Sequence, residues 1–304
     1  MYHRFFGLKE LPFTLSPDTE YFFAHGHYAN ALNTLIVALR TGEGFIKVTG
    51  EVGTGKTLLC RKLLKTVGKN FFSIYIANPQ LSPHGLQVAI AEELSLPITR
   101  YTHRLLNQIT EKLTALSEEG RQVVLCIDEA QAMPKETLEA LRLITNLETE
   151  KQKLIQVVLF GQPELNTSIS DPAVRQLKQR ITFSYQLEPL TINEMNAYIQ
   201  HRLRVAGFIG VQIFDENALN AIHKYSLGIP RLVNILCHKS LMAAYGKGQR
   251  VITSSLADLA IRDTNEIQTF HTAKNSGQKN IWWLSASSAL FAAMASFATY
   301  YVMQ

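Results

Sequence analysis

The strongest constraint on this chain is the segment 50–57, GEVGTGKT, which matches the phosphate-binding pattern G-x-x-x-x-G-K-[ST] at every fixed position. Its glycines let the backbone turn tightly enough for consecutive N–H groups to point at phosphate oxygens. An apolar strand pattern (45–49) precedes the loop and a helical pattern (58–66) follows it, so a helix N-terminus adds positive potential. The segment therefore predicts a binding site for a nucleoside triphosphate.

Each residue of this loop has an expected contact with the nucleotide. Lys56 is expected to reach the β- and γ-phosphates, and the Thr57 hydroxyl to hold Mg²⁺. The other residues expected to surround the phosphates are Gly50, Glu51, Val52, Gly53, Thr54, Gly55 and Leu58. The loop thus predicts a magnesium nucleotide as cofactor.

Strand and helix patterns alternate from the loop to about residue 189, which predicts a parallel sheet covered by helices. The run 123–127 is almost continuously apolar and ends in Asp128 and Glu129, as in a buried parallel strand that opens onto a ligand crevice. From Thr191 onward the pattern is entirely helical. We therefore predict an α/β domain over 45–189 with an N-terminal segment, 1–44, and a helical lid domain over 190–264.

The two carboxylates after the strand at 123–127 indicate hydrolysis. Asp128 is expected to anchor Mg²⁺ through water, and Glu129 to polarise a water for in-line attack on the γ-phosphate. A protein that only binds nucleotide does not need the second carboxylate. Gln162 follows the predicted strand 154–160, where its amide is placed to contact the γ-phosphate or the attacking water.

Three arginines extend this hypothesis beyond one subunit. Arg180, with Arg175 as the alternative, lies where a guanidinium can project to the nucleotide of a neighbouring subunit. Arg231 begins a lid helix and is expected to report the nucleotide state to the lid domain. Any one of them alone would more often be a solvated surface residue, so the hypothesis depends on their order along the chain.

Aromatic residues are dense ahead of the loop. Two interpretations stay open for them: they wall a pocket for the base, or they cover an edge of the sheet. The residues concerned include Phe5, Phe6, Phe13, Tyr21, Phe22 and Phe23.

Charge and cysteine content bear on the binding partners and on the cellular compartment of the protein. The net charge of +5 is spread along the chain without a polybasic run, so it selects neither nucleic acid nor an anionic membrane. Cys60, Cys126 and Cys237 are far apart, which predicts buried free thiols in a reducing compartment and no metal site. Residues 1–10 carry charges and lack an apolar core, so we expect no signal peptide.

The C-terminal residues predict a membrane anchor. Residues 265–280 are polar and read as a linker, whereas 281–303 contain no charged residue and would span roughly 35 Å as a helix. Pairs of Trp and Tyr lie at its two ends, where interfacial aromatic residues are expected. Lys274 and Lys279 precede it, which predicts a cytoplasmic ATP-binding body. A buried helix of the soluble domain remains the alternative.

The motif order resembles that of AAA+ ATPases. More narrowly, five segments resemble the family of general secretion pathway protein A (ExeA): FGLKELPF at 6–13, TGEVGTGKT at 49–57, DEAQ at 128–131, GQPEL at 161–165 and HRL at 201–203. The resemblance covers roughly residues 1–265. It implies a three-layer α/β fold with a helical lid, ATP and Mg²⁺ as cofactors, Gln162 as sensor 1, Arg180 as arginine finger and Arg231 as sensor 2. By the same analogy, Asn78 tethers Glu129 until a partner binds.

The function implied by this resemblance is that of an ATPase anchored in a bacterial inner membrane. It would form a homo-oligomer, presumed to be ring-shaped by analogy, and couple ATP turnover to assembly of a type IV (MSHA-like) pilus or a type II secretion complex. Nucleic acid is not an expected partner in this interpretation. Two alternatives stay open: a DNA-dependent ATPase of the transposition or replication-loader type, and a phosphotransferase acting on a small molecule.

Overall fold

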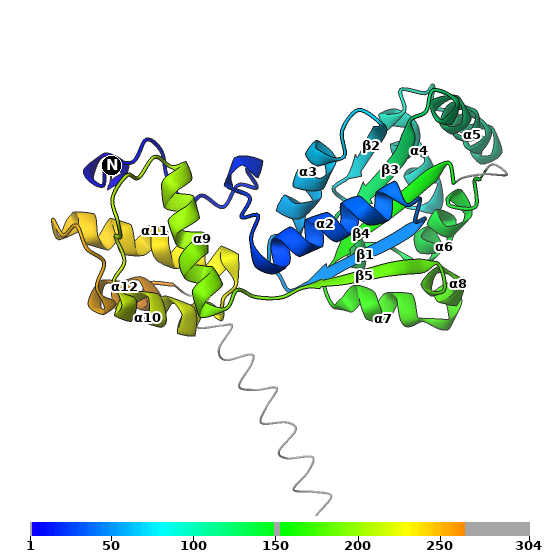
Figure 1. Cartoon of the computed structure of the whole chain (residues 1–304). Coiled ribbons are helices and arrows are strands. Elements are labelled where there is room, and N and C mark those ends of the chain that lie inside the picture. The colour runs from blue at the N-terminus through cyan, green and yellow to red at the C-terminus, as the bar shows by residue number, and fades with distance from the viewer. Residues whose placement is uncertain (1, 149–152, 265–304) are drawn as a thin grey trace, which may run out of the picture.

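The computed structural model describes residues 2–148 and 153–264, and Figure 1 shows an α/β domain beside a helical domain. The predicted linker 265–280 and membrane span 281–303 lie outside the described residues. Among the residues that are described, no helix combines the length and the apolar character needed to cross a bilayer.

The α/β domain is built on five parallel strands in the order β2-β3-β4-β1-β5. The strands are β1 (Phe45–Gly50), β2 (Phe71–Ile76), β3 (Gln122–Ile127), β4 (Ile155–Gly161) and β5 (Ile181–Leu187). The predicted parallel sheet is therefore confirmed. Because the chain leaves β1 toward the β2 edge and later returns to β5 on the other side of β1, the order reverses at β1. Such a switch point opens a crevice at the carboxyl ends of the strands.

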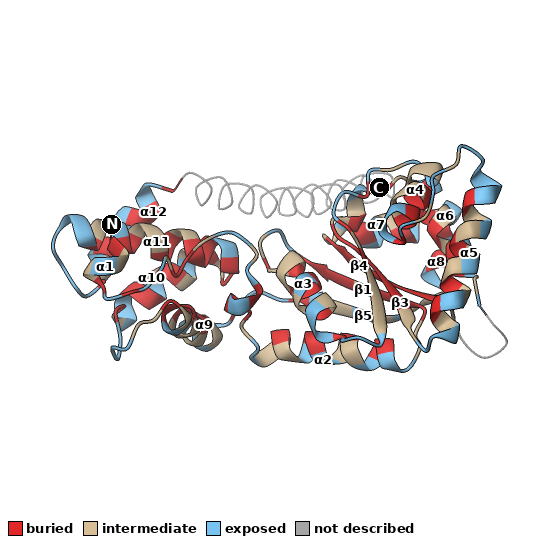
Figure 2. Cartoon of the chain, turned by 90° about the horizontal axis from the view of Figure 1, so that it is seen from above, coloured by how far each residue is buried: buried red, intermediate tan, exposed pale blue. Residues whose placement is uncertain are grey.

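Helices cover both faces of the sheet and form a three-layer domain. On β3, Val124 and Cys126 face the core shared with α2 and α3, whereas Val123, Leu125 and Ile127 face the core shared with the helices of the other layer. Burial on both faces explains the nearly continuous apolar runs of β3 and β4 (Figure 2). The helices are α2 (Gly26–Arg40), α3 (Lys56–Thr66), α4 (Pro83–Glu93), α5 (Thr102–Glu118), α6 (Lys135–Ile144), α7 (Glu164–Ser170) and α8 (Arg175–Lys178).

The helical domain consists of α9 (Ile192–Val205), α10 (Glu216–Ser226), α11 (Pro230–Gly246) and α12 (Ser254–Arg262). Two of these helices, α9 and α10, begin at polar caps. Thr191 and Glu194 form a reciprocal capping box on α9, and the Asp215 side chain accepts from the Ala218 N–H at 2.6 Å. Gly228 ends the α10 turn with φ of 73°, and a Cβ there would lie 2.0 Å from the Leu190 carbonyl oxygen. The close approach therefore requires glycine.

The N-terminal residues pack mainly on the helical domain. After α1 (Tyr2–Phe5), the Lys9 N–H donates to the Ala206 carbonyl at 2.8 Å, and the Phe13 ring meets Phe214 edge-on. The chain then makes a short 3₁₀ turn (Thr19–Tyr21) and enters α2 on the sheet. Residues before the loop in sequence thus connect the two domains.

Candidate nucleotide-binding site

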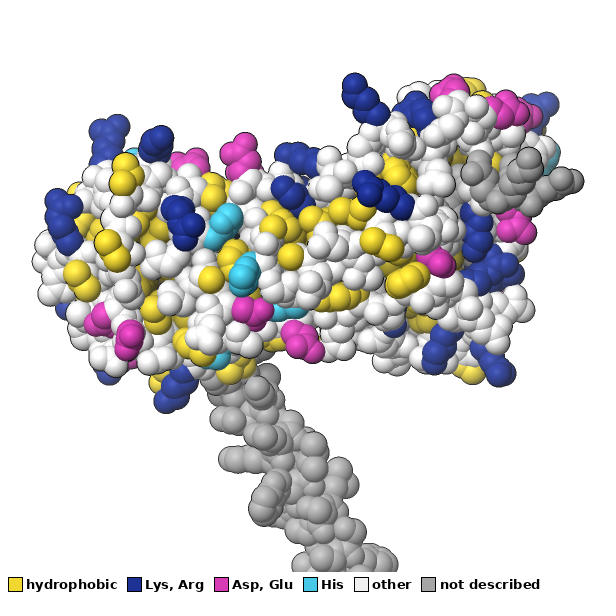
Figure 3. All heavy atoms as spheres, viewed as in Figure 1, with side chains coloured by type: hydrophobic (Ala, Val, Ile, Leu, Met, Phe, Trp, Pro, Cys, Tyr) yellow, Lys and Arg dark blue, Asp and Glu magenta, His cyan; other side chains and the backbone are white. Residues whose placement is uncertain are grey.

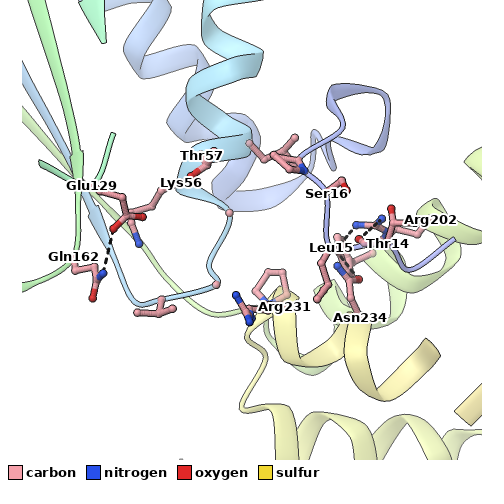
Figure 4. Close-up of a pocket in the computed structure, with 17 residues that line it drawn as sticks. Thr14, Leu15, Ser16, Lys56, Thr57, Glu129, Gln162, Arg202, Arg231 and Asn234 are labelled. Carbon is pink, nitrogen blue, oxygen red and sulfur yellow. Dashed lines mark hydrogen bonds between the residues drawn. The ribbon is translucent and has the colours of Figure 1, made fainter. Parts of the chain in front are cut away.

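The phosphate-binding loop lies between β1 and α3 and faces the helical domain across a cavity of about 300 Å³ (Figure 4). Three parts of the chain line this cavity: the loop with the ends of β3 and β4, the N-terminal segment, and helices α9 and α11. The lining residues predicted from the sequence are Val52, Gly53, Gly55, Lys56, Thr57, Leu58, Glu129, Gln162 and Arg231. The structure therefore brings together side chains that are far apart along the chain.

Two glycines give the loop its shape. Gly53 and Gly55 have φ of 82° and 93°, in the left-handed region that favours glycine. A Cβ on Gly53 would also come within 2.7 Å of Arg231 Cβ, so the lid approaches the loop closely here. Inside the loop, the Thr54 hydroxyl donates to the Glu51 carbonyl at 2.8 Å and holds the turn.

Lys56 is buried at the start of α3. Its ammonium donates to the carbonyl oxygens of Gly50 and Glu51 at 2.8 and 2.9 Å. Burial lowers the pKa of Lys56, while the carboxylates of Glu129 and Asp128 act in the opposite direction. The ammonium is therefore held by two neutral oxygens that phosphate oxygens can replace with a stronger, charge-assisted contact.

Thr57 and Asp128 form a pair of oxygen ligands. The Thr57 hydroxyl donates to Asp128 Oδ2 at 2.6 Å although 71 positions separate the residues, and Asp128 is buried. The Tyr75 hydroxyl donates to the same carboxylate oxygen at 3.3 Å, and burial followed by the Asp128 charge raises the pKa of Tyr75 to about 12. A hydroxyl and one carboxylate beside a phosphate loop are a donor set that suits Mg²⁺, which prefers hard oxygen ligands.

Two glutamine side chains hold Glu129. Its carboxylate accepts from Gln131 Nε2 at 2.6 Å and from Gln162 Nε2 at 3.2 Å, the latter drawn in Figure 4. The Gln162 N–H in turn donates to Gln131 Oε1 at 2.9 Å. Glu129 has φ of 50°, so its backbone also turns sharply at the end of β3. We call these three residues the glutamate clamp.

The expected tether from Asn78 is wrong. The Asn78 side-chain oxygen accepts from the Gln80 N–H at 3.3 Å, and Asn78 is exposed at the end of β2. A 3₁₀ turn (Ala130–Ala132) instead folds Gln131 back onto Glu129. Sequence reasoning had Gln131 within the DEAQ segment but gave it no role, because amide contacts depend on the turn.

Besides Arg231, the lid lines the cavity with four residues to which the sequence gave no role: Tyr198, Arg202, Pro230 and Asn234. Arg202 is only 3% exposed, and its guanidinium donates to the carbonyl oxygens of Pro12 and Thr14 at 2.6 and 3.2 Å. It also donates to the Tyr198 hydroxyl at 3.0 Å, which donates to Asn234 Oδ1 at 2.9 Å. Only the HRL segment at 201–203 marked this position in the sequence.

These lid contacts place the N-terminal segment at the cavity wall. Residues 14–17 line the cavity directly beyond the carbonyl groups that Arg202 holds. On the other side, the Arg231 N–H donates to the Gly53 carbonyl at 3.2 Å, so α11 contacts the loop itself. The nucleotide site is therefore formed by both domains.

The two interpretations of the early aromatic residues each need qualification. Phe22, Phe23 and Tyr28 line a small apolar cavity of about 30 Å³ that adjoins the loop at Gly55 and Leu58 and is too small to hold a base as it stands. Phe5, Phe6 and Phe13 belong to the core that includes the helical domain. The later aromatic residues, 22–28, thus lie beside the nucleotide site, whereas the earlier ones, 5–13, attach the N-terminus to the helical domain.

Arg180 and Arg175 do not line the cavity of their own chain. Arg180 precedes β5, whose first residue pairs with Phe45 at the start of β1, whereas the loop follows the end of β1. Its guanidinium donates to the Arg142 carbonyl and the Thr145 hydroxyl, both at 3.4 Å. Arg175 is exposed at the start of α8. Both arginines therefore lie at the opposite end of the sheet from the loop.

Comparison with known proteins agrees with this geometry. Residues 39–169 match the family model described as an AAA domain. General secretion pathway protein A of Aeromonas hydrophila is 42% identical over 270 residues, which are 88% of this chain and 49% of that protein. The chain belongs to the family of general secretion pathway protein A. It spans about half the length of this relative.

Solved structures share the fold at low sequence identity. The ORC2 protein of Aeropyrum pernix, in its ADPNP–ADP complexes, aligns with a TM-score of 0.59 and 17% identity, covering 79% of this chain and 67% of that one. Cdc6p of Pyrobaculum aerophilum aligns with a TM-score of 0.60 and 20% identity, covering 79% and 67%. The RuvB branch-migration motor of Thermotoga maritima aligns with 0.54 and 20%, covering 78% and 68%. The chain is an AAA protein with a nucleotide-binding fold.

Proposed function

We propose that this protein is an ATPase that couples ATP hydrolysis to the assembly of a type IV pilus or type II secretion complex at a bacterial inner membrane. One observation carries the enzymatic part of the proposal. A buried lysine, a Thr–Asp pair and a second carboxylate held by amides meet at one phosphate-binding loop. A protein that only binds nucleotide has no need of Glu129.

Each side chain has a role in this proposal. Lys56 leaves the loop carbonyl oxygens to bind the β- and γ-phosphates, while Thr57 and Asp128 would hold Mg²⁺. The metal, when bound, neutralises charge on the phosphates. Glu129 takes a proton from the attacking water, and the Gln162 amide orients that water or the γ-phosphate. Gln131 and Gln162 both donate to Oε2 of Glu129, so Oε1 stays available to accept the proton, and the two contacts lower the basicity of the carboxylate.

Hydrolysis is proposed to take place between subunits of a homo-oligomer. Arg180, or Arg175 in its place, lies at the end of the sheet opposite the loop of its own chain. In this proposal a guanidinium there would contact the nucleotide of a neighbouring copy, and Arg231 at the start of α11 would relay nucleotide state to the lid. The location of Arg180 supports a ring or other closed assembly.

The membrane and assembly roles rest on the sequence and on the relative. The predicted span 281–303 supports a membrane anchor that leaves the ATPase body in the cytoplasm. Mg²⁺-dependent ATP turnover would then take place on the cytoplasmic side. The 42% identity to general secretion pathway protein A supports a place in secretion machinery. The finer resemblance to the pilus-biogenesis member MshM favours a pilus as the object assembled.

Glu129→Gln provides the test of the enzymatic proposal. The variant should bind ATP with wild-type affinity and lose at least about a hundredfold in turnover, because an amide cannot accept the proton. Glu136→Gln, in the first turn of α6, is the matched control and should leave turnover unchanged. Undiminished turnover in Glu129→Gln would refute the assigned role.

Membrane fractionation and crosslinking test the proposed membrane anchor and the proposed assembly partners. The full chain should sediment with inner membranes, the chain without 281–304 should not, and crosslinked partners should be pilus or secretion assembly proteins. A soluble full-length protein would overturn the anchor, and crosslinking to DNA instead of assembly proteins would overturn the coupling role.

A further inference from the structure

One end of the helical domain carries basic and exposed apolar side chains that the nucleotide site does not use. It is built from three segments: 2–9, the turn after α9 at 204–212, and the turn after α11 at 245–251. Together they contain Arg4, Lys9, Arg204, Lys247 and Arg250 and no aspartate or glutamate. We call this surface the basic tip.

Backbone and side-chain contacts hold the three segments together. The Lys9 side chain lies beside Gly207, where a Cβ would come within 2.8 Å of Lys9 Cγ. Arg250 donates to the Phe5 carbonyl at 2.9 Å and stacks over the Phe5 ring. The two turns meet where the Ile252 N–H donates to the Ile213 carbonyl at 2.7 Å. The basic tip is therefore one surface of the fold.

Two aliphatic side chains of this surface stand out by their exposure. Ile209 and Val211 are 97% and 95% exposed, the highest values among the large exposed hydrophobic residues of the described chain. Tyr245 and Val251 on the neighbouring turn are also exposed. Figure 3 shows Lys and Arg side chains with hydrophobic ones between them at the end of the molecule formed by the helical domain. An exposed aliphatic pair surrounded by cations needs an occupant that is both anionic and apolar.

We propose that the basic tip docks onto an anionic lipid bilayer, with Ile209 and Val211 entering the headgroup region and the surrounding cations contacting lipid phosphates. Charge complementarity accounts for the lysines and arginines, since anionic headgroups attract each basic residue near the surface. The aliphatic pair separates a bilayer from nucleic acid, because phosphates of a duplex offer nothing to Ile209 and Val211, whereas the acyl boundary does. Docking at the tip would turn the lid domain toward the membrane. It adds a second membrane contact to the anchor of the proposed function, on which this inference rests.

Because the inference rests partly on a membrane location, the experiment must separate docking from anchoring. The three native cysteines are buried. Ile209→Cys in the full chain can therefore be labelled selectively with the environment-sensitive fluorophore NBD. Ile98→Cys is the matched control, since Ile98 is an exposed aliphatic residue of the α/β domain, 55% exposed.

The full chain is placed in vesicles of phosphatidylcholine alone and of phosphatidylcholine mixed with phosphatidylglycerol. NBD at position 209 should shift to the blue and be quenched by nitroxide-labelled lipid only with the anionic lipid, and salt at about 1 M should reverse both effects. Position 98 should respond to neither lipid. Arg204→Ala and Lys247→Ala should each reduce the docked-to-undocked ratio about fivefold.

Every other outcome overturns the inference. Equal signals in neutral and anionic vesicles, equal signals at positions 209 and 98, or no signal at 209 would each exclude docking of the tip. A blue shift with duplex DNA but not with vesicles would assign the surface to nucleic acid, and a shift that depends only on protein concentration would assign it to a second copy. Extraction of the chain by alkaline carbonate reports on the anchor separately, so failure of the anchor is distinguishable from failure of docking.

Discussion

The two sides of the nucleotide cavity are built in different ways. On the loop side, Lys56 contacts the carbonyls of Gly50 and Glu51, five or six residues away. On the lid side, Arg202 contacts the carbonyls of Pro12 and Thr14, about 190 residues away. The loop side takes its local shape from a short segment, whereas the lid side exists only when the two domains and the N-terminus have packed.

The two sides also differ in their roles: the loop side carries the proposed chemistry, and the lid side holds the domains together. In the proposed function, side chains of the loop side bind phosphate and accept a proton. When nucleotide binds, Lys56 would exchange its hydrogen bonds to the loop carbonyls for contacts with phosphate oxygens. Side chains of the lid side satisfy one another in a buried network, Arg202 to Tyr198 to Asn234. Changes on the loop side should therefore affect activity without affecting stability, and changes on the lid side should affect both.

The largest effect is expected on the loop side. Lys56→Ala removes the cation that meets the phosphates and should lower kcat/KM for ATP by about a thousandfold, comparable to losing one strong transition-state donor. The loss of thermal stability in the nucleotide-free protein should be smaller than in Arg202→Ala, because water in the cavity can reach the carbonyl oxygens of Gly50 and Glu51 once the lysine is removed. Lys69→Ala, at an exposed lysine after α3, is the control for steady-state ATPase assays. A large loss of stability in Lys56→Ala would contradict the separation.

The next effect is expected on the lid side. Arg202→Ala leaves two buried acceptors and one partly buried acceptor without their donor and should lower the free energy of unfolding by about 3 kcal/mol. ATP affinity should also fall about tenfold, because residues 14–17 lose their support. Urea unfolding and nucleotide titration measure the two effects. Arg204→Ala, two positions along α9 and exposed, should change neither.

An intermediate effect distinguishes the two glutamines of the glutamate clamp. Gln131→Ala removes the shorter contact to Glu129 and should raise basal turnover a few fold, since a hydrogen bond to a charged group contributes about 1.5 kcal/mol or more. Gln162→Ala should lower turnover, because Gln162 also faces the cavity. Single-turnover measurements under saturating ATP compare them. Equal losses in both variants would show that Gln131 positions Glu129 and does not restrain it.

The smallest effect concerns the link between α2 and α9. Burial alone would raise the pKa of Glu194, but hydrogen bonds from Thr191 and the nearby His27 hold that pKa below its ordinary value of 4.5. The ionised carboxylate therefore adds stability above pH 4.5, and this stability is lost as the pH falls through the lowered folded-state pKa.

Glu194→Gln should accordingly destabilise the protein by less than about 1 kcal/mol at neutral pH, since the group is partly exposed and screened. The difference from wild type should shrink in acid. Urea midpoints at several pH values measure it, and Glu188→Gln, an exposed neighbour, is the control. A difference that grows in acid would contradict the assigned direction.

Local patterns predicted the elements better than their contacts. The expected strands 45–49, 123–127 and 154–160 agree with β1, β3 and β4 to within one residue at each end, because continuous apolar runs are local signals. No element was predicted for the stretch that forms helix α7 (Glu164–Ser170). Its apolar residues Leu165 and Ile169 pack against the sheet only in the tertiary structure.

The sequence by itself determined the phosphate loop, the two carboxylates after β3 and the α/β class, because a backbone turn and a buried strand depend on neighbouring residues. Only the tertiary structure decided which side chains hold Glu129, and that Arg202 connects the N-terminal segment to the lid. The physical reason is the range of the interactions. Hydrogen bonds between residues about 190 positions apart exist only after the strands have paired and the domains have packed.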